Sequence, residues 1–184
     1  MLSEIRWHGR GGQGVVTASR MLAQAALLEG KFVQAFPEFG PERTGAPILG
    51  YTRVSDERIR LHSHVYFPSI VVVLDSTLLE AADVGAGLAR GGRLIVNSQE
   101  SPSEVKSKLS VVEARTFTVD ATKISLEVLG KAITNTAMLG AVIKAAPIVG
   151  MPSVKTAVKE RFPGSLGDKN IEAIERAYKG VISE

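Results

Sequence analysis

A cluster of glycines near the start of the chain has the composition of an anion-binding loop. Its residues read Gly9-Arg10-Gly11-Gly12-Gln13-Gly14, which contains the pattern G-x-G-x-x-G. Glycine permits a tight turn and a close approach of the backbone to a ligand, and the unpaired N–H groups at a helix start attract phosphate. Arginine inside the loop adds a phosphate-seeking charge. The stretch therefore indicates a diphosphate or anion cradle, with a purely structural turn as the simpler alternative.

The acidic residue of a complete dinucleotide site is not where it is expected. Such a site has an acid about 20 residues after the glycines, at the end of the second strand, to hold a ribose. Gln34 and Phe36 occupy that neighbourhood, and the nearest acid, Glu38, follows Pro37. This weakens the NAD interpretation and favours another anion. A self-contained Rossmann-type nucleotide-dependent oxidoreductase stays open as an alternative.

Polar residues also end three predicted strands. Asp75 ends "SIVVVLD", Asn97 and Ser98 end "LIVNS", and Asp120 lies near the end of "FTVDAT". In an open parallel sheet, ligands collect beyond the carboxyl ends of the strands, which is the edge that carries the glycine loop. Taken singly, the two aspartates and the serine are explained more simply as caps of following helices.

A proline- and glycine-rich stretch follows the second predicted strand. "PEFGPERTGAP", residues 37 to 47, cannot continue a helix or a central strand. It carries Glu42, Arg43 and Thr44 on a stiff loop next to the glycine loop, which suits contact with an anion or a partner. The alternative is an ordinary surface turn.

The hydrophobic pattern predicts the elements that position these residues. Strand 4–8, the glycine turn and a helix from Gln13 to Leu28 begin a βαβ unit, and residues 31–36 form the second strand. "ILGYTRVSD" and "RIRLHSHV" alternate at period two around Asp56 and Glu57, which predicts an antiparallel hairpin. His62 and His64 would share one face of that hairpin; no third ligand accompanies them, so we interpret them as ordinary histidines and expect no metal site.

The rest of the chain alternates buried strands with helices. We predict strands in "SIVVVLD", "GGRLIVNS" and "RTFTVDAT", a helix in "STLLEAADVGAGLAR", and four C-terminal helices: 124–129, 134–146, 154–161 and 170–182. Pro152 falls in a first helical turn, and Asp168 is a plausible N-cap of the last helix. The expected fold is a single domain, residues 1–184, of three-layer α/β/α Rossmann-like type, with a mostly parallel sheet and an antiparallel hairpin insertion.

Composition excludes several classes of function. The 184 residues include no cysteine, so this chain has no disulfide, no thiolate-held iron–sulfur cluster and no cysteine nucleophile. The net charge is only +3 and no basic run occurs, so nucleic acid is not indicated. The longest apolar run, "IVVVL", is far too short to span a membrane, and we expect no signal peptide, because the first residues lack a basic start followed by an apolar run. We therefore expect a cytoplasmic protein without membrane contacts.

Several ordered motifs together resemble a known family. "HGRGGQGVVTASRMLAQAALLEGKFVQAFPEFGPERTGAPILGYTRVSDERI", "VVVLDSTLL", "GGRLIVNS", "VDATKIS", "NTAMLGA" and "PGSLGDKNIEAIERAYKGV" are similar to the gamma subunits of 2-oxoacid:ferredoxin oxidoreductases, above all of pyruvate:ferredoxin oxidoreductase, or pyruvate synthase. The resemblance covers nearly the whole chain. Arg43-Thr44-Gly45 stands where many related chains have Arg-Gly-Gly, a departure that would follow substrate class.

The resemblance implies one subunit of a cytoplasmic complex with alpha, beta and delta partners. Other subunits would carry thiamine diphosphate, Mg²⁺ and [4Fe-4S] clusters, and the complex would convert pyruvate and coenzyme A to acetyl-CoA and CO2 while reducing ferredoxin. This chain would cover the thiamine site and help position coenzyme A, with no catalytic residue of its own and no activity alone. A complex for branched-chain or aryl 2-oxoacids, and a non-catalytic interaction module, remain alternatives.

Family resemblance also assigns residues to these roles. Gly9 to Gly14 would hold the phosphates of coenzyme A or another anion, and Glu42, Arg43 and Thr44 would face the thiamine subunits. Asn97 and Asn135 lie in matching motifs and would sit near the same edge.

Overall fold

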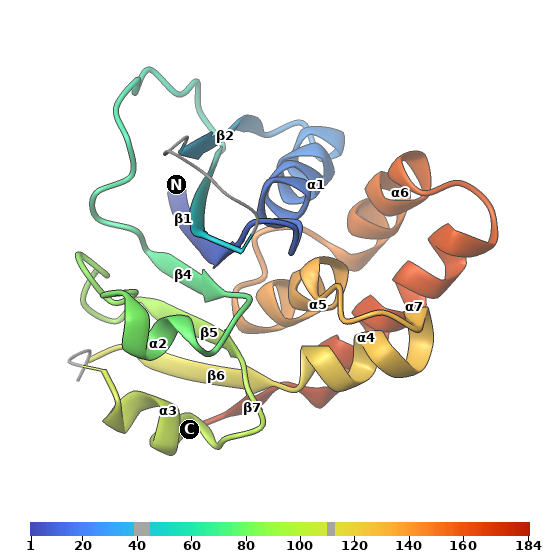
Figure 1. The fold of residues 1–184 in the computed structure, drawn as a ribbon. Helices are drawn as coiled ribbons and strands as arrows, with labels where there is room; N and C mark the ends of the chain where they lie inside the picture. Colours follow the sequence, from blue (N-terminus) through green and yellow to red (C-terminus); the bar gives the residue numbers. More distant parts are fainter. Residues whose placement is uncertain (39–44, 110–112) are drawn as a thin grey trace.

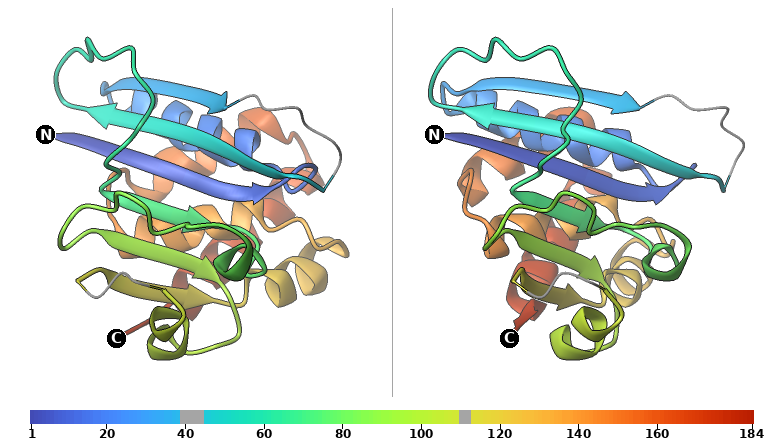
Figure 2. Two further views of the ribbon diagram at one scale, coloured as in Figure 1. Left: turned by 60° about the vertical axis from the view of Figure 1, so that its left-hand side comes forward. Right: turned by 90° about the vertical axis from the view of Figure 1, so that its left-hand side faces the viewer.

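The chain folds around a twisted mixed sheet. The structure is a computed structural model that describes residues 1–38, 45–109 and 113–184. Seven strands in these ranges are hydrogen-bonded in the order β2-β3-β1-β4-β5-β6-β7 (Figure 2). Their bounds are Leu2–Arg10 (β1), Phe32–Glu38 (β2), Pro47–Ser55 (β3), Ile70–Val73 (β4), Arg93–Asn97 (β5), Arg115–Val119 (β6) and Ile182–Ser183 (β7). Of these, β3 and β7 run antiparallel to the rest.

Helices cover both faces of the sheet, which confirms the predicted three-layer α/β/α class (Figure 1). The larger layer consists of α1 (Val15–Leu28), α4 (Ala121–Leu129), α5 (Asn135–Ala145), α6 (Met151–Arg161) and α7 (Ser165–Gly180). The other face carries the short helices α2 (Leu78–Ala81) and α3 (Pro102–Ser107). Helices α1 and α7 bury apolar residues at the predicted helical spacing, and Pro152 lies in the first turn of α6 as expected.

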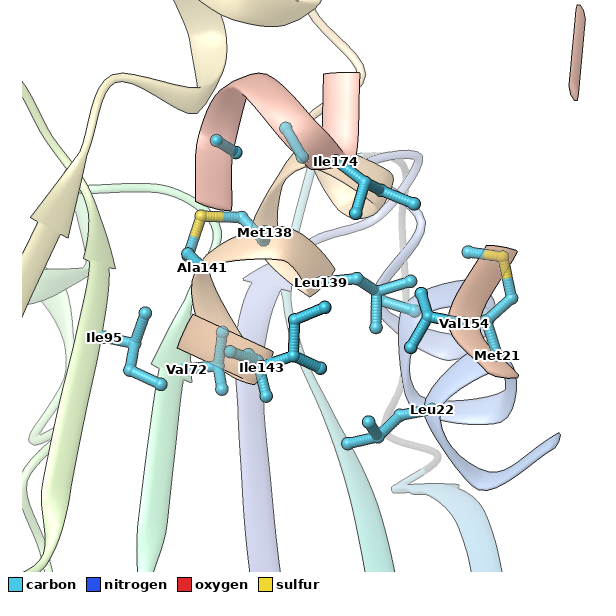
Figure 3. Close-up of a cluster of buried hydrophobic side chains, with 14 of the residues drawn as sticks. Met21, Leu22, Val72, Ile95, Met138, Leu139, Ala141, Ile143, Val154 and Ile174 are labelled. Carbon is cyan, nitrogen blue, oxygen red and sulfur yellow. The ribbon is translucent and has the colours of Figure 1, made fainter. Parts of the chain in front are cut away.

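The main core lies between the sheet and the larger helical layer. Helix α5 is its centre, because ten of its eleven residues are buried. Figure 3 shows Leu139 and Ile143 of α5 between Val72 of the sheet and the side chains of α1 and α6. Gly140 lets α7 approach, since a Cβ there would meet the carbonyl group of Ile174. This packing fixes the N-terminal end of α5 against the glycine loop.

Strand β1 separates two environments by its alternation. Ile5 and Trp7 face the main core and are fully buried, while Arg6 and His8 face the opposite side of the sheet. The Trp7 indole Nε1–H donates to Thr52 Oγ1 at 3.0 Å. One strand therefore supplies apolar anchors to the core and polar groups to the other face.

The predicted hairpin within residues 48–65 is wrong in its pairing. Strand β3 pairs antiparallel with both β1 and β2, so the hairpin is formed by β2 and β3. Residues 58–65 form no strand, because both edges of β3 are already hydrogen-bonded. They belong to a segment, residues 56–69, that crosses in front of β3 and β1 before β4 begins (Figure 2).

Two local predictions also need correction, and two short elements escaped prediction. The helix expected over residues 76–90 shrinks to α2, because Gly85 and Gly87 belong to turns that follow it. Asp168 is not an N-cap: α7 begins at Ser165, and Asp168 lies in its first turn. Helix α3, which starts with a capping box at Ser101, and the two-residue strand β7 had no visible period.

Candidate functional site at the glycine loop

The glycine loop joins β1 to α1 at the carboxyl edge of the sheet, and two of its glycines are conformationally required. Gly12 has φ +94° and Gly14 has φ +81°, in the region that other residues avoid. A Cβ on Gly14 would also come within 3.0 Å of Asn135 Cγ, whereas one on Gly12 would meet nothing within 4 Å. Gly14 thus packs against α5, whereas Gly12 has free space where a side chain would begin.

Arg10 and Gln13 hold the loop rather than extend freely from it. Gln13 Oε1 accepts from the backbone N–H of Arg10 at 2.7 Å, and its amide donates to Asp75 at 2.7 Å. The Arg10 guanidinium lies 3.3 Å from Asp75 and donates to Thr77 and to the carbonyl of Gly45. Partial burial raises the pKa of Asp75, but hydrogen bonds from Thr77 and Gln13 and the Arg10 charge outweigh it, and the pKa is lowered. Arg10 therefore stiffens the loop and is itself balanced by a carboxylate.

What the loop offers to a ligand is backbone N–H groups. Gly11 donates to Ala46 and Gln13 to Arg10, but the N–H groups of Gly12, Gly14 and Val15 have no acceptor among the residues that the structure describes. They lie at the start of the fourteen-residue helix α1, whose dipole favours negative charge there. The start of α5 is adjacent through the contact of Gly14 with Asn135. Two helix N-termini thus meet at one point, which suits a phosphate or carboxylate.

The two predicted asparagines differ in what remains available. Asn97 donates to the Leu74 carbonyl and to Thr122 Oγ1, both at 2.9 Å, and accepts from the Thr122 backbone N–H at 3.2 Å. The Asn97 side chain, at the end of β5, therefore links the residue that follows β4 to the first turn of α4. Asn135 is placed beside the glycine loop; its Oδ1 accepts from the N–H of Thr136. Asn135 is therefore the better placed of the two to act on a ligand of the loop.

Of the other polar residues at strand ends, one caps a helix as predicted and another does not. Asp120 caps α4 by accepting from the Lys123 N–H at 2.9 Å, as its simpler interpretation required. Ser98 instead accepts from Glu100, and Ser101 caps α3. Residues 42–44 lie outside the described ranges.

The described ranges contain neither a metal-binding cluster nor a membrane-spanning helix. No group of three or more acidic or histidine side chains there is arranged to hold a metal ion. Likewise, none of the helices in that part of the chain is long and apolar enough to cross a membrane.

A cleft on the opposite face of the sheet was missed by the sequence reasoning. It has a volume of about 900 Å³ and lies between β1, β3, the crossing segment 56–69 and the turns after α2. Arg6, His8 and Tyr51 form its floor, each less than 10% exposed. The signal in the sequence was the alternation of polar Arg6 and His8 with apolar Ile5 and Trp7.

The cleft floor is electrostatically unusual. The Arg6 Nε–H donates to His8 Nε2 at 3.0 Å, which places the histidine's proton on Nδ1. Burial, and then the neighbouring Arg6 charge, lower the pKa of His8 to about 3, so this side chain is neutral at physiological pH. Burial and the hydrogen bond to Glu38 raise the pKa of Tyr51 well above its ordinary value.

Comparison with known proteins places the chain in a family. Residues 4–180 match the model of the pyruvate ferredoxin/flavodoxin oxidoreductase family. The common gamma subunit of the pyruvate/ketoisovalerate oxidoreductases of Thermococcus litoralis is 53% identical over 179 residues, covering 97% of each chain. The pyruvate synthase subunit PorC of Methanocaldococcus jannaschii is 46% identical over 98% of each chain.

The fold agrees with the sequence comparison. The crystal structure of the pyruvate oxidoreductase subunit PORC of Thermotoga maritima covers all of this chain with a TM-score of 0.90 and 40% identity. Since a family model spans nearly the whole chain and full-length relatives exceed 45% identity, this chain belongs to the pyruvate ferredoxin/flavodoxin oxidoreductase family, among relatives that are named as its gamma or PorC subunits.

Proposed function

We propose that this chain is the gamma subunit of a cytoplasmic pyruvate:ferredoxin oxidoreductase, with alpha, beta and delta subunits as partners and ferredoxin as the electron acceptor of the complex. The complex would convert pyruvate and coenzyme A to acetyl-CoA and CO2. Thiamine diphosphate with Mg²⁺, and [4Fe-4S] clusters, would supply the decarboxylation and electron transfer from partner chains. The family match carries this proposal, and the absence of cysteine agrees with clusters held elsewhere.

Within the complex, the glycine-loop edge would help hold coenzyme A and cover the thiamine site. Three N–H groups that have no acceptor within the described ranges, together with two helix N-termini, suit the phosphates of coenzyme A. Positioning the thiol and excluding water from a reactive intermediate would be this chain's contribution to the rate. Its own residues would transfer no electron and no acyl group.

A self-contained nucleotide-dependent oxidoreductase is less well supported. In this fold β3 lies between β1 and β2, which separates the end of β2 from the glycine loop. Glu38, the acid at that end, accepts a hydrogen bond from Tyr51 in the cleft. An acid that holds a ribose would have to lie beside the loop.

The substrate class depends on the partners. Relatives named as a common subunit of pyruvate and ketoisovalerate oxidoreductases are 53% identical to this chain. Such a shared subunit would serve several 2-oxoacids if the substrate pocket is built by other chains. We therefore propose pyruvate as the substrate and a branched-chain 2-oxoacid as the second candidate.

Anoxic purification of the tagged chain from its native cell tests the proposal. Co-purification of other subunits with iron, thiamine diphosphate and coenzyme-A-dependent pyruvate oxidation is expected. Assaying the same sample with 2-oxoisovalerate distinguishes the two substrate classes. A chain that emerged alone with a bound nicotinamide nucleotide would reverse the proposal in favour of the Rossmann-type oxidoreductase.

A further inference from the structure

The cleft behind the sheet has free hydrogen-bond donors on a largely buried floor. His8 donates nothing from Nδ1, and Arg6 nothing from Nη1, to any residue in the described ranges. Both side chains line the cleft. They are 94% and 92% buried respectively. Unused donors on buried side chains are the kind of polar group that orients a bound molecule.

Other hydrogen bonds hold the two side chains that carry these donors. Arg6 Nη2 donates to the carbonyls of Val84 at 3.1 Å and Ala86 at 2.5 Å, and its Nε to His8. These bonds hold both side chains in place and leave the Nη1 group of Arg6 and the Nδ1–H of His8 for a ligand. A ligand group that accepts hydrogen bonds, such as a carbonyl oxygen, therefore fits this floor.

The charge of the cleft disfavours an anion. Arg6 is the cation on the floor, and it is opposed by the carboxylates of Glu38 and Asp83, both of which line the cleft and interact with it. The neutral His8 adds no positive charge. The net negative charge of the cleft would repel a further anion, whereas it would not repel an uncharged carbonyl group. At the glycine loop, by contrast, the Asp75 carboxylate is paired with Arg10.

The rim is aromatic and exposed. Phe67 is 75% exposed and Tyr66 63% exposed, although both line the cleft. Exposed aromatic side chains beside a recess with buried polar groups are typical of a protein interface, where they act as anchors. A small ligand would leave most of this rim uncovered.

We propose that the cleft between β1, β3 and residues 64–67 is a docking site for an uncharged, apolar-rich polypeptide segment of a partner subunit. A backbone carbonyl of that segment accepts from His8 Nδ1–H, and its apolar side chains pack on Phe67 and Tyr66. The inference rests on the proposed function, since it requires a complex, and it identifies a contact surface separate from the coenzyme A edge.

Photo-cross-linking in the intact complex tests the inference. Phe67 is replaced by photoreactive benzoylphenylalanine, the complex is purified without oxygen and irradiated, and the joined peptides are identified by mass spectrometry. We expect a cross-link to a partner subunit, in a segment without charged residues. Cross-links confined to a second copy of this chain, or an intact complex with no cross-link, would overturn the inference and leave the proposed function standing. If no partner co-purifies, the proposed function itself has failed.

A binding measurement gives a second, independent readout. Phe67→Ser is compared with Leu126→Ser, which removes a 50% exposed side chain from α4 in the other layer. Loss of an interface anchor weakens binding to the remaining subunits on the order of 30-fold, and the control changes it little. Equal affinities for two variants with unchanged circular dichroism would reject the docking site. Binding of coenzyme A in the cleft, with no partner subunit in contact there, would also reject the docking site.

Discussion

Replacing Gly14 by alanine tests how the glycine loop is joined to α5. Alanine at φ +81° incurs backbone strain of about 1–2 kcal/mol. The new Cβ would also lie within 3.0 Å of Asn135 Cγ, and still closer to its amide nitrogen. Overpacking of this kind adds about 1–3 kcal/mol. We therefore expect Gly14→Ala to lower the free energy of unfolding by about 2–5 kcal/mol.

Gly12→Ala is the matched control. Its φ is +94°, so the backbone strain is similar, but its Cβ would meet nothing within 4 Å. It should cost only about 1–2 kcal/mol. Urea denaturation of the purified subunit, followed by circular dichroism, measures the difference between the two variants. Each kcal/mol also lowers the Tm of a chain this size by about 2–4 °C.

A double-mutant cycle identifies the cause. Asn135→Ala removes the amide that the new Cβ would strike, so it should recover part of the loss in Gly14→Ala despite losing the hydrogen bond to Thr136. Equal losses for Gly12→Ala and Gly14→Ala, or strict additivity with Asn135→Ala, would refute the claim that α5 fixes the loop.

The remaining predictions concern the core, a helix cap and the buried histidine. Gly140→Ala should destabilise the subunit by about 3 kcal/mol in a denaturant titration, because its Cβ would overlap the Ile174 carbonyl; a cost under about 0.5 kcal/mol would contradict the α5–α7 contact. Asp120→Ala should cost about 1 kcal/mol and Asp120→Asn much less, because the asparagine oxygen can still accept from the Lys123 N–H and alanine has no acceptor; equal thermal shifts would argue against the cap. The pKa of His8 is lowered from 6.5 to about 3, so the unfolded chain binds an extra proton between these values and stability falls as pH falls, by about 1.4 kcal/mol per unit well below pH 6.5. Urea titrations of wild type and His8→Gln at pH 7, 6 and 5 check this, and identical slopes would contradict it.

Local signals account for the parts of the fold that the sequence predicted correctly. The order of β1, glycine turn and α1 follows from a strand pattern, positive-φ residues and a helical period, all within one stretch of chain. The buried strands β4, β5 and β6 were visible as apolar, β-branched runs. Each of these features is specified by neighbours in sequence.

Non-local pairing explains what the sequence did not reveal. The alternating residues 58–65 are compatible with a strand. However, β3 pairs with β1 on one side and β2 on the other, and no local sequence pattern predicts this pairing. The cleft follows from the same event, because Arg6 and Tyr51 become neighbours only when β3 aligns beside β1. For the glycine loop, the sequence indicated an anion site but not that Arg10 would be paired with Asp75.

A charge placed at Gly12 tests the central claim, that the glycine loop of this subunit serves coenzyme A. Aspartate and asparagine tolerate positive φ and have nearly the same shape, so Gly12→Asp and Gly12→Asn differ mainly in charge. Two unit charges about 4 Å apart near a protein surface repel by about 4 kcal/mol before salt screening. We predict that Gly12→Asp raises the KM of the complex for coenzyme A at least about tenfold over Gly12→Asn, while the KM for pyruvate is the same in both. Equal coenzyme A KM values in two fully assembled complexes would contradict the assignment.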